Sequence, residues 1–290
     1  MAPNAPSTSS GKWPKLPYPS LYFGGCAFGA AFYVGVYKAL WEKYGPDFAR
    51  GLAVSGGSAG TIFAMGIALG KTPEYMDDLY RTVARNSHDS GPIYNPFSHT
   101  GASVFMEQGL RYMVEGDPLA YKKIEGLCFC GTTRYYDNHR WHMSWESNED
   151  MIKCVQWSYH IPFYCHRPLS MMVDGVHVLD GAYGFSGVDL LHGDATLYIG
   201  IDPHAEITRE FTNTEMFFPA VGKAYDDIVD SGYRAMMDFK GGMIKKVGHR
   251  LPNYPALKVL WFLKVLEVYI LTWPTLVGVL LLMGLFRWRF

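Results

Sequence analysis

The sequence predicts an α/β fold with a largely parallel central sheet. Short apolar runs of strand length alternate with longer segments in which apolar residues recur at helical spacing. Two connections from strand to helix, at residues 24–29 and 56–60, are rich in glycine. In a parallel sheet such turns lie at one edge, which is where α/β folds bind their ligands. We therefore expect a functional site where these two turns meet.

The first two strands each lead through a glycine-rich turn into a helix. The apolar run at 21–23 precedes a helix expected at 30–44. The run at 52–55 precedes a helix expected at 59–69. The repetition of this strand-turn-helix unit is the main reason for predicting an α/β sandwich.

A third helix is expected to begin after Thr72, since a capping side chain, Pro73 and Glu74 all favour a helix start. We expect this helix to end near Arg85. The remaining expected elements are, in order, a long loop at 86–100, a helix at 103–115, strands at 124–132 and 141–145, a helix at 150–159, a β-hairpin at 171–179 and a buried strand at 196–201.

The composition argues against nucleic-acid binding and is compatible with contact to lipid. The 290 residues are enough for one domain with a substantial core, and 49% of them are hydrophobic against only 18% charged. A formal net charge of -1 gives no basis for binding a polyanion. The 16% aromatic share suits lipid interfaces as well as protein cores.

Neither a metal site nor a disulfide is expected. His139 and His142 have no carboxylate or thiol partner at ligand spacing and are interpreted as surface residues. The cysteines are odd in number and lack a C-x-x-C pair, so we interpret them as buried free thiols in a reducing, cytosol-facing compartment. They are Cys26, Cys128, Cys130, Cys154 and Cys165.

The two ends of the chain differ from its central part, residues 21–250. Residues 1–20 are rich in Pro, Ser and Ala, lack an apolar signal segment and are expected to form a disordered arm. Residues 268–286 contain no charged side chain, and this segment is long enough to cross the hydrocarbon core of a membrane. We therefore predict a hydrophobic membrane anchor at 251–290. One spanning helix and a hairpin bent at Pro274 remain open as its form, and a buried core helix is the competing interpretation.

Ser58 lies in a G-x-S-x-G motif between a strand and a helix, the setting in which this motif forms a nucleophile elbow. Gly56 and Gly60 let the backbone bend sharply, so that the Ser58 hydroxyl stands above the sheet near the first amides of the helix. Taken alone, the motif fits equally well a glycine-rich turn whose serine caps a helix. A nucleophilic serine also needs a base and an oxyanion hole.

Two catalytic arrangements fit this serine. One is a triad in the chain order serine, acid, histidine. Its candidates are Ser58, then Asp180 or Asp202, then His192, His204 or His249. The other is a Ser-Asp dyad, in which a carboxylate acts on the serine directly and a separate glycine-rich turn supplies the oxyanion hole. The dyad explains more of the chain, because only the dyad accounts for the exposed amides of the turn at 24–29.

Asp180 is the preferred base of this dyad. It follows the second strand of the expected hairpin, and Gly181 lets the backbone pass close by. Asp174 is also followed by glycine, but the turn of the hairpin is sufficient to explain it. The oxyanion hole is assigned to the backbone of Gly24, Gly25, Cys26 and Ala27.

These blocks, in this order, resemble the patatin-like phospholipase family. The matching segments are the glycine-rich turn at 24–29, the serine motif at 56–60 and the Asp-Gly-Ala at 180–182, and the segment 157–163 is also similar to the one ahead of the family's acid. The resemblance covers roughly residues 21–203. The form Gly-Cys-Ala-Phe-Gly followed by Tyr-Val-Gly-Val at 33–36 is most similar to the adipose triglyceride lipase and adiponutrin branch.

The resemblance implies a three-layer α/β/α sandwich with a mainly parallel sheet. It implies that Ser58 is the nucleophile that becomes acylated, that Asp180 is its base and that the amides of the first turn hold the oxyanion. It implies no metal and no cofactor. The chain departs from the family at Phe28, where plant patatins carry arginine, at Ala182, where a second glycine is usual, and in lacking the Asn-Pro that often follows.

From these observations we expect a membrane-associated serine lipid acyl hydrolase of the phospholipase or triacylglycerol lipase type. Its substrate would be a glycerophospholipid or an acylglycerol at a membrane or lipid-droplet surface. We expect an intracellular membrane location, at the endoplasmic reticulum or a lipid droplet, with the catalytic domain facing the cytosol. A catalytically silent lipid-binding or scaffold protein of the same fold, or a lipid transacylase, is the alternative. The sequence identifies no protein partner.

Overall fold

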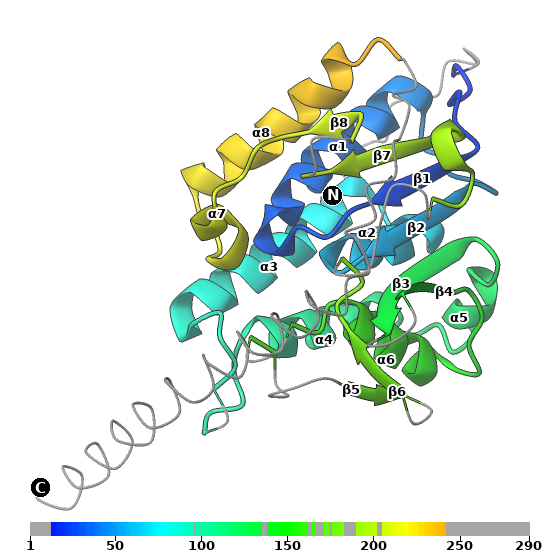
Figure 1. Ribbon diagram of the computed structural model, residues 1–290. Helices are drawn as coiled ribbons and strands as arrows, with labels where there is room; N and C mark the ends of the chain where they lie inside the picture. The colour runs from blue at the N-terminus through cyan, green and yellow to red at the C-terminus, as the bar shows by residue number, and fades with distance from the viewer. Residues whose placement is uncertain are drawn as a thin grey trace, which may run out of the picture. The chain divides into compact units, whose positions relative to one another are not determined.

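The computed structural model shows a mixed α/β fold around one central, mostly parallel sheet (Figure 1). It describes residues 13–95, 97–134, 138–161, 164–165, 171–173, 176–182, 190–201 and 205–241. The strands of the eight-stranded sheet are β1 (Ser20–Phe23), β2 (Ala53–Gly57), β3 (Cys128–Arg134), β4 (Asn138–His142), β5 (Met171–Val173), β6 (Val176–Leu179), β7 (Thr196–Gly200) and β8 (Ile207–Thr208).

The strand order is β5-β6-β3-β2-β1-β7-β8, and β4 pairs with β3 away from this path. Strands β3, β2, β1, β7 and β8 run parallel, whereas β4, β5 and β6 form an antiparallel edge. The turns after β1 and β2 therefore lie side by side at the carboxyl edge, as predicted. The hairpin of β5 and β6 is confirmed as well, although its turn, with Asp174, lies outside the described residues.

The helices confirm most of the predicted pattern. They are η1 (Ala27–Ala30), α1 (Ala31–Tyr44), α2 (Ala59–Ala68), α3 (Pro73–Ser90), α4 (Ala102–Met113), α5 (Ala120–Lys123), α6 (Asn148–Ser158), η3 (Gly193–Ala195), α7 (Asn213–Phe217) and α8 (Lys223–Asp238). Thr72 caps α3 as expected, accepting a hydrogen bond from the Tyr75 amide. Helices α5, α7 and α8 were not anticipated.

The sheet has two different faces because alternate residues of a strand point to opposite sides. Leu21 and Phe23 of β1 join the main core, to which α1, α2, α3, α4, α6 and α8 all contribute. Tyr22 points the other way and packs with Tyr198 and Trp141. Leu190 and Ala205 complete this smaller cluster on the second face, whereas the helices named above bury their apolar residues in the main core.

Helices α1 and α8 cross at very short range, and α8 lies along α1 in Figure 1. A Cβ on Gly35 of α1 would collide with the backbone of α8 at Val229, and a Cβ on Gly232 of α8 would collide with the backbone of α1 at Phe32. Each helix thus presents a glycine to the other helix's backbone. The last described helix is locked onto the first by this contact.

A buried carboxylate ties these two helices to α3. Asp77 of α3 accepts hydrogen bonds from Lys38 Nζ of α1 at 2.5 Å, from Arg81 Nε at 2.9 Å and from the Tyr225 hydroxyl of α8 at 3.1 Å. Because Asp77 is only 8% exposed, these partners are needed to compensate for its lost hydration.

Several boundaries differ from prediction, among them the start of β3, which is Cys128 and not residue 124. Helix α3 continues to Ser90, because Ser87 is fully buried and tertiary packing overrides its weak helix propensity, so the loop covers only 91–101. Residues 13–19, assigned to a disordered arm, instead contribute Leu16 and Tyr18 to the core. Strand β4 begins at Asn138, three residues before the predicted start.

The predicted membrane anchor at 251–290 lies outside the described residues. Among the helices that the structure describes, none combines the length and the apolar character needed to cross a membrane.

The glycine at the α1–α8 crossing can be tested by substitution. Gly35→Ala should lower the free energy of unfolding by about 1–3 kcal/mol, because the new methyl group meets rigid backbone atoms of α8. Gly66→Ala in α2 is the matched control, since its methyl group would meet the flexible end of Met76. Urea unfolding of both variants measures the difference. A larger loss for Gly66→Ala would contradict this account of the crossing.

Candidate active site

Ser58 occupies a strained turn between β2 and α2. Its backbone has φ 55° and ψ -133°, a conformation that residues other than glycine rarely adopt. A Cβ on Gly60 would collide with the carbonyl oxygen of Phe23, and one on Gly56 would collide with the backbone of Gly60. Both glycines are therefore required for the sharp bend. No side chain caps the start of α2, so its first amides face the Ser58 side of the turn.

The hydroxyl of Ser58 donates a hydrogen bond to Oδ2 of Asp180 at 2.5 Å. Asp180 follows β6, and its other oxygen, Oδ1, accepts from the Ala182 amide at 2.8 Å. Its backbone is fixed as well, since its amide donates to the His160 carbonyl and its carbonyl accepts from Thr133 Oγ1. The serine and the carboxylate, 122 residues apart in sequence, thus meet with no group between them.

Burial raises the pKa of Asp180 from 3.8 to about 7, while the hydrogen bonds from Ser58 and Ala182 oppose this rise. The side chain is only 2% exposed. A carboxylate with a pKa near neutrality is a stronger base than an exposed aspartate and is still ionised in a large fraction of molecules at pH 7. The site therefore has the electrostatics of a general base.

Ser158, at the end of α6, holds the elbow in place. Its Oγ accepts a hydrogen bond from the Ser58 amide at 2.9 Å, donates to the Gly131 carbonyl at 2.5 Å and lies 2.8 Å from Thr61 Oγ1. Its carbonyl accepts from the Gly181 amide at 2.7 Å. One residue therefore connects the nucleophile turn to the acid. Ser158 lies in the segment 157–163 that is similar to the patatin-like family, but its role could not be predicted, since a lone serine in a helix carries no chemical signal.

The predicted oxyanion turn lies against Ser58. A Cβ added to Gly25 would lie 3.0 Å from the Ser58 Cβ and 2.6 Å from the Ala182 Cβ, so the turn, the nucleophile and the acid corner are in contact. Within the described part of the chain, the amides of Gly25, Cys26 and Ala27 donate to no acceptor. They are the amides that remain for an oxyanion.

The assignment of Gly24 to the oxyanion hole is wrong, because its amide already has an acceptor. Its amide donates to the Ile199 carbonyl of β7 at 2.9 Å, so it continues the sheet and has no hydrogen left for a ligand. Its carbonyl accepts from the buried Tyr33 hydroxyl of α1 at 2.8 Å. Gly24 and Tyr33 therefore fix the start of the turn, a role that the sequence pattern could not distinguish from oxyanion binding.

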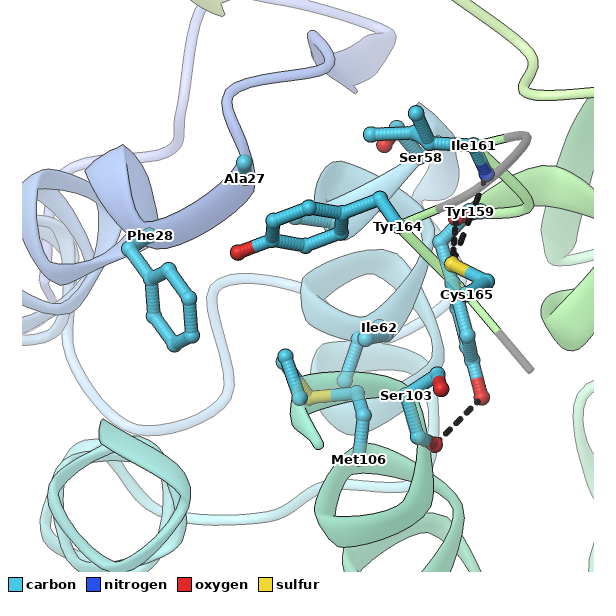
Figure 2. A pocket seen from close by; sticks show the side chains of 12 residues that line it. Ala27, Phe28, Ser58, Ile62, Ser103, Met106, Tyr159, Ile161, Tyr164 and Cys165 are labelled. Carbon is cyan, nitrogen blue, oxygen red and sulfur yellow. Dashed lines mark hydrogen bonds between the residues drawn. The ribbon is translucent and has the colours of Figure 1, made fainter. Parts of the chain in front are cut away.

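An apolar pocket extends from Ser58 between α2 and α4 (Figure 2). Figure 2 shows Ser58 at one end of the lining group and Met106 at the opposite end. The Tyr164 hydroxyl donates to the Phe217 carbonyl and the Cys165 thiol to the Tyr159 carbonyl, whereas the buried Ser103 hydroxyl has no hydrogen-bond partner among the described residues. The lining residues are Ala27, Phe28, Ser58, Ala59, Ile62, Ala102, Ser103, Met106, Tyr159, Ile161, Tyr164 and Cys165.

Of the residues considered for a triad, the structure describes some and not others. In the described part of the chain, no imidazole hydrogen-bonds to the Ser58 hydroxyl, and His192 lies at the N-cap of η3, where its amide donates to Thr196. The other triad candidates, Asp202, His204 and His249, lie outside the described residues. A direct carboxylate partner is therefore the arrangement that the described residues contain.

The interpretation of His139 as a surface residue was wrong. Both ring nitrogens are buried, the ring packs edge-on against Trp141, and burial lowers the pKa of His139 to about 4. The five cysteines are free and buried, as predicted. Among the described residues, no group of His, Cys, Asp or Glu side chains is placed to hold a metal ion.

No known family model and no curated protein matches the sequence. Several solved structures are similar to this chain, and two of them are described here. The crystal structure of VipD from Legionella pneumophila has 11% sequence identity and a TM-score of 0.45, over 77% of this chain and 67% of that one. The crystal structure of the type III effector protein ExoU has 12% identity and a TM-score of 0.40, over 77% of this chain and 52% of that one. The chain thus spans about half the length of ExoU.

The raised pKa of Asp180 predicts a pH-dependent stability. Between about pH 4 and pH 7 the native state keeps a proton on Asp180 that the unfolded chain has released, so stability falls as the pH rises through this range. Asp180→Asn removes this loss and should be more stable than the wild type at pH 8, by roughly 3–5 kcal/mol.

Urea unfolding at pH 5 and pH 8 measures this effect, and the difference between wild type and variant isolates the contribution of Asp180. Asp89→Asn, at an exposed position, is the control and should follow the wild type. Parallel pH profiles for the wild type and Asp180→Asn would show that the Asp180 pKa is close to its ordinary value.

Proposed function

We propose that this protein is a patatin-like serine hydrolase that removes acyl chains from lipid esters at a membrane surface. The observation that carries the proposal is the direct hydrogen bond between Ser58 and a buried Asp180, at one end of an apolar pocket. A serine hydroxyl held by a base and next to free amides has what acyl transfer requires. The described residues fit the dyad of this family better than they fit a triad.

In the first step, Asp180 accepts the proton of Ser58 as Oγ attacks the ester carbonyl. The carbonyl oxygen becomes an oxyanion, for which the amides of Gly25, Cys26 and Ala27 and the start of α2 provide hydrogen-bond donors and positive potential. Collapse of the tetrahedral intermediate breaks the ester C–O bond. The leaving alcohol takes the proton from Asp180, and the acyl group remains on Ser58.

In the second step, Asp180 takes a proton from water as the water attacks acyl-Ser58. The second tetrahedral intermediate breaks down to a fatty acid, and the proton returns from Asp180 to Ser58. A pKa near 7 suits both steps, because the same group must accept and then release a proton near neutral pH.

The pocket supports a lipid substrate. Phe28, Ile62, Met106 and Ile161 offer a ligand apolar contact, and the pocket begins at the nucleophile. An acyl chain there would gain stabilisation from removing apolar surface from water. We propose a glycerophospholipid or an acylglycerol as substrate. Phe28, where plant patatins carry arginine, would then contact the substrate chain directly.

We also propose that segment 251–290 attaches the protein to an intracellular membrane or lipid droplet, with the catalytic domain in the cytosol. The uncharged run at 268–286 supports attachment, and the adjacent Trp and Arg residues suit a headgroup region. Five buried, unpaired cysteines favour a reducing compartment. The adipose triglyceride lipase and adiponutrin branch remains the most similar part of the family.

A catalytically silent lipid-binding protein and a transacylase are the alternatives. The site favours an enzyme over a silent protein. The strained backbone of Ser58 and the burial of Asp180, which its hydrogen bonds offset only in part, reduce stability without helping a lipid to bind. A transacylase would use the same acyl-Ser58 with a lipid alcohol in place of water. Only its products distinguish it from a hydrolase.

The decisive experiment offers the purified full chain phospholipid and triacylglycerol substrates. Ser58→Ala and Asp180→Asn should each lower fatty-acid release by about 10³-fold or more, since one removes the nucleophile and the other its base. In the wild type, kcat/KM should rise with pH through about 7 as Asp180 loses its proton.

A fluorophosphonate probe supplies the control, because it should label the wild type and leave Ser58→Ala unlabelled. Folded wild-type protein that resists the probe would favour the silent lipid-binding protein. Full activity of the Asp180→Asn variant would show that Asp180 is not the base, and would contradict the dyad. Acyl transfer to an added lipid alcohol in place of fatty-acid release would identify a transacylase.

The oxyanion turn can be tested at Gly25. Gly25→Ala should lower kcat by about 10²–10³-fold, because the new methyl group would push the turn away from Ser58 and Ala182 and misplace the amides. Gly29→Ala is the matched control on the same turn, since its methyl group would make only ordinary contacts at 3.4 Å and beyond. Steady-state kinetics on one substrate compare the two variants, and equal losses would count against the oxyanion assignment.

A further inference from the structure

The loop at 91–101, between α3 and α4, is an uncharged projection with large apolar side chains. Its sequence contains no Asp, Glu, Lys or Arg. Ile93 is 56% exposed and Phe97 is 77% exposed. Removing these exposed side chains from water would be favourable, by an amount that grows with the apolar area covered.

The loop is held in this shape by its own hydrogen bonds. The Asn95 amide donates to the Thr100 carbonyl at 2.9 Å, and the Phe97 amide donates to the Asn95 side chain at 2.9 Å. The hydroxyls of Ser98 and Thr100 are 2.7 Å apart. Phe97 is therefore presented outward by a tight turn and does not fold back onto the core.

The loop is continuous with the pocket. It leads directly into α4, whose first residues Ala102 and Ser103 line the pocket. The Tyr94 amide donates to the carbonyl of Tyr164, another lining residue, at 3.2 Å. Figure 2 shows the Tyr164 ring extending across the pocket between Ser58 and Phe28.

Tyr164 also joins the loop to α7. Its hydroxyl donates to the Phe217 carbonyl at 2.7 Å, and the two rings are in contact. The next residue, Phe218, is 56% exposed. Ile93 and Phe97 thus belong to the loop whose Tyr94 is bonded to Tyr164, and Phe218 follows the Phe217 that Tyr164 contacts. We call Ile93, Phe97 and Phe218 the apolar rim.

We propose that the apolar rim docks onto a lipid membrane surface and places the mouth of the pocket against it. An uncharged loop with outward aromatic side chains enters the headgroup region without transferring a charge from water. A lipid ester could then pass from the membrane to Ser58 with little apolar surface exposed to water. The purpose of this docking rests on the proposed lipid hydrolase function, but the contact itself does not. Docking of the apolar rim would be a membrane contact of the catalytic domain itself, separate from the one proposed for segment 251–290.

A fluorescent label at the loop tip tests the contact without using activity. The native cysteines are all buried, and burial raises the pKa of Cys26 and Cys165 to about 12, so Phe97→Cys would provide the accessible thiol for an environment-sensitive dye. With phosphatidylcholine vesicles, the full-length labelled protein should show a blue shift and quenching by brominated lipid. Leu119→Cys is the control, because Leu119 is 51% exposed and lines no part of the pocket.

Activity supplies the second readout. Phe97→Ser should lower the ratio of the rate on vesicle-borne phospholipid to the rate on a soluble short-chain ester by about tenfold, the scale expected for removing one phenylalanine from an apolar contact. Leu119→Ser should leave this ratio unchanged.

The outcomes separate the two proposals. Equal dye spectra and quenching at positions 97 and 119 would overturn the docking proposal. A dye shift that follows protein concentration without vesicles would also overturn it, by assigning the rim to self-association. A lipid-dependent shift at position 97 in a protein that hydrolyses neither substrate would retain the docking surface and reject the hydrolase.

Discussion

The burial of the Asp180 carboxylate, with no positively charged side chain beside it among the described residues, is the constraint on which the site depends. Among the described residues, its carboxylate accepts hydrogen bonds from the Ser58 hydroxyl and from the backbone amide of Ala182. A lysine or arginine in contact would lower the carboxylate's pKa and weaken it as a base. The surrounding backbone must therefore hold Asp180 in place. Its amide donates to the carbonyl of His160, just after α6, and its carbonyl accepts from Thr133 of β3. The amides of the next two residues donate to the Ser158 carbonyl of α6 and to the carboxylate itself.

The same constraint explains where the fold accepts unfavourable local structure. Ser58 is held in a strained backbone conformation, and glycines at 25, 56, 60 and 181 replace side chains where the segments meet. Ser158 compensates by joining three of these segments through one buried hydroxyl and one carbonyl. Stability lost at Ser58 and Asp180 is offset by the large aromatic core and by the α1–α8 crossing.

The sequence predicted the parts of this site that local pattern determines. The glycine-serine elbow, the turn at 24–29 and the Asp-Gly corner have distinctive residue spacings, and the described structure brings Ser58, Asp180 and Gly25 together. It did not predict Ser158 or Tyr33, because their roles depend on partners that are distant in sequence. Gly24 was misassigned since pairing with β7 is a long-range property. The helix after residue 85 was missed because burial, not propensity, determines it.

The strand order has a consequence for the synthesis of the chain. β1, which leads into the oxyanion turn, lies between β2 and β7, and the Gly24 amide is bonded to β7. A nascent chain emerges N-terminal first, so about two thirds of it has been made before the turn acquires its neighbour. The base is likewise 122 residues behind the serine. Ser58 is therefore translated long before Asp180, its proposed base, and a chain that ends between these two residues carries the serine alone.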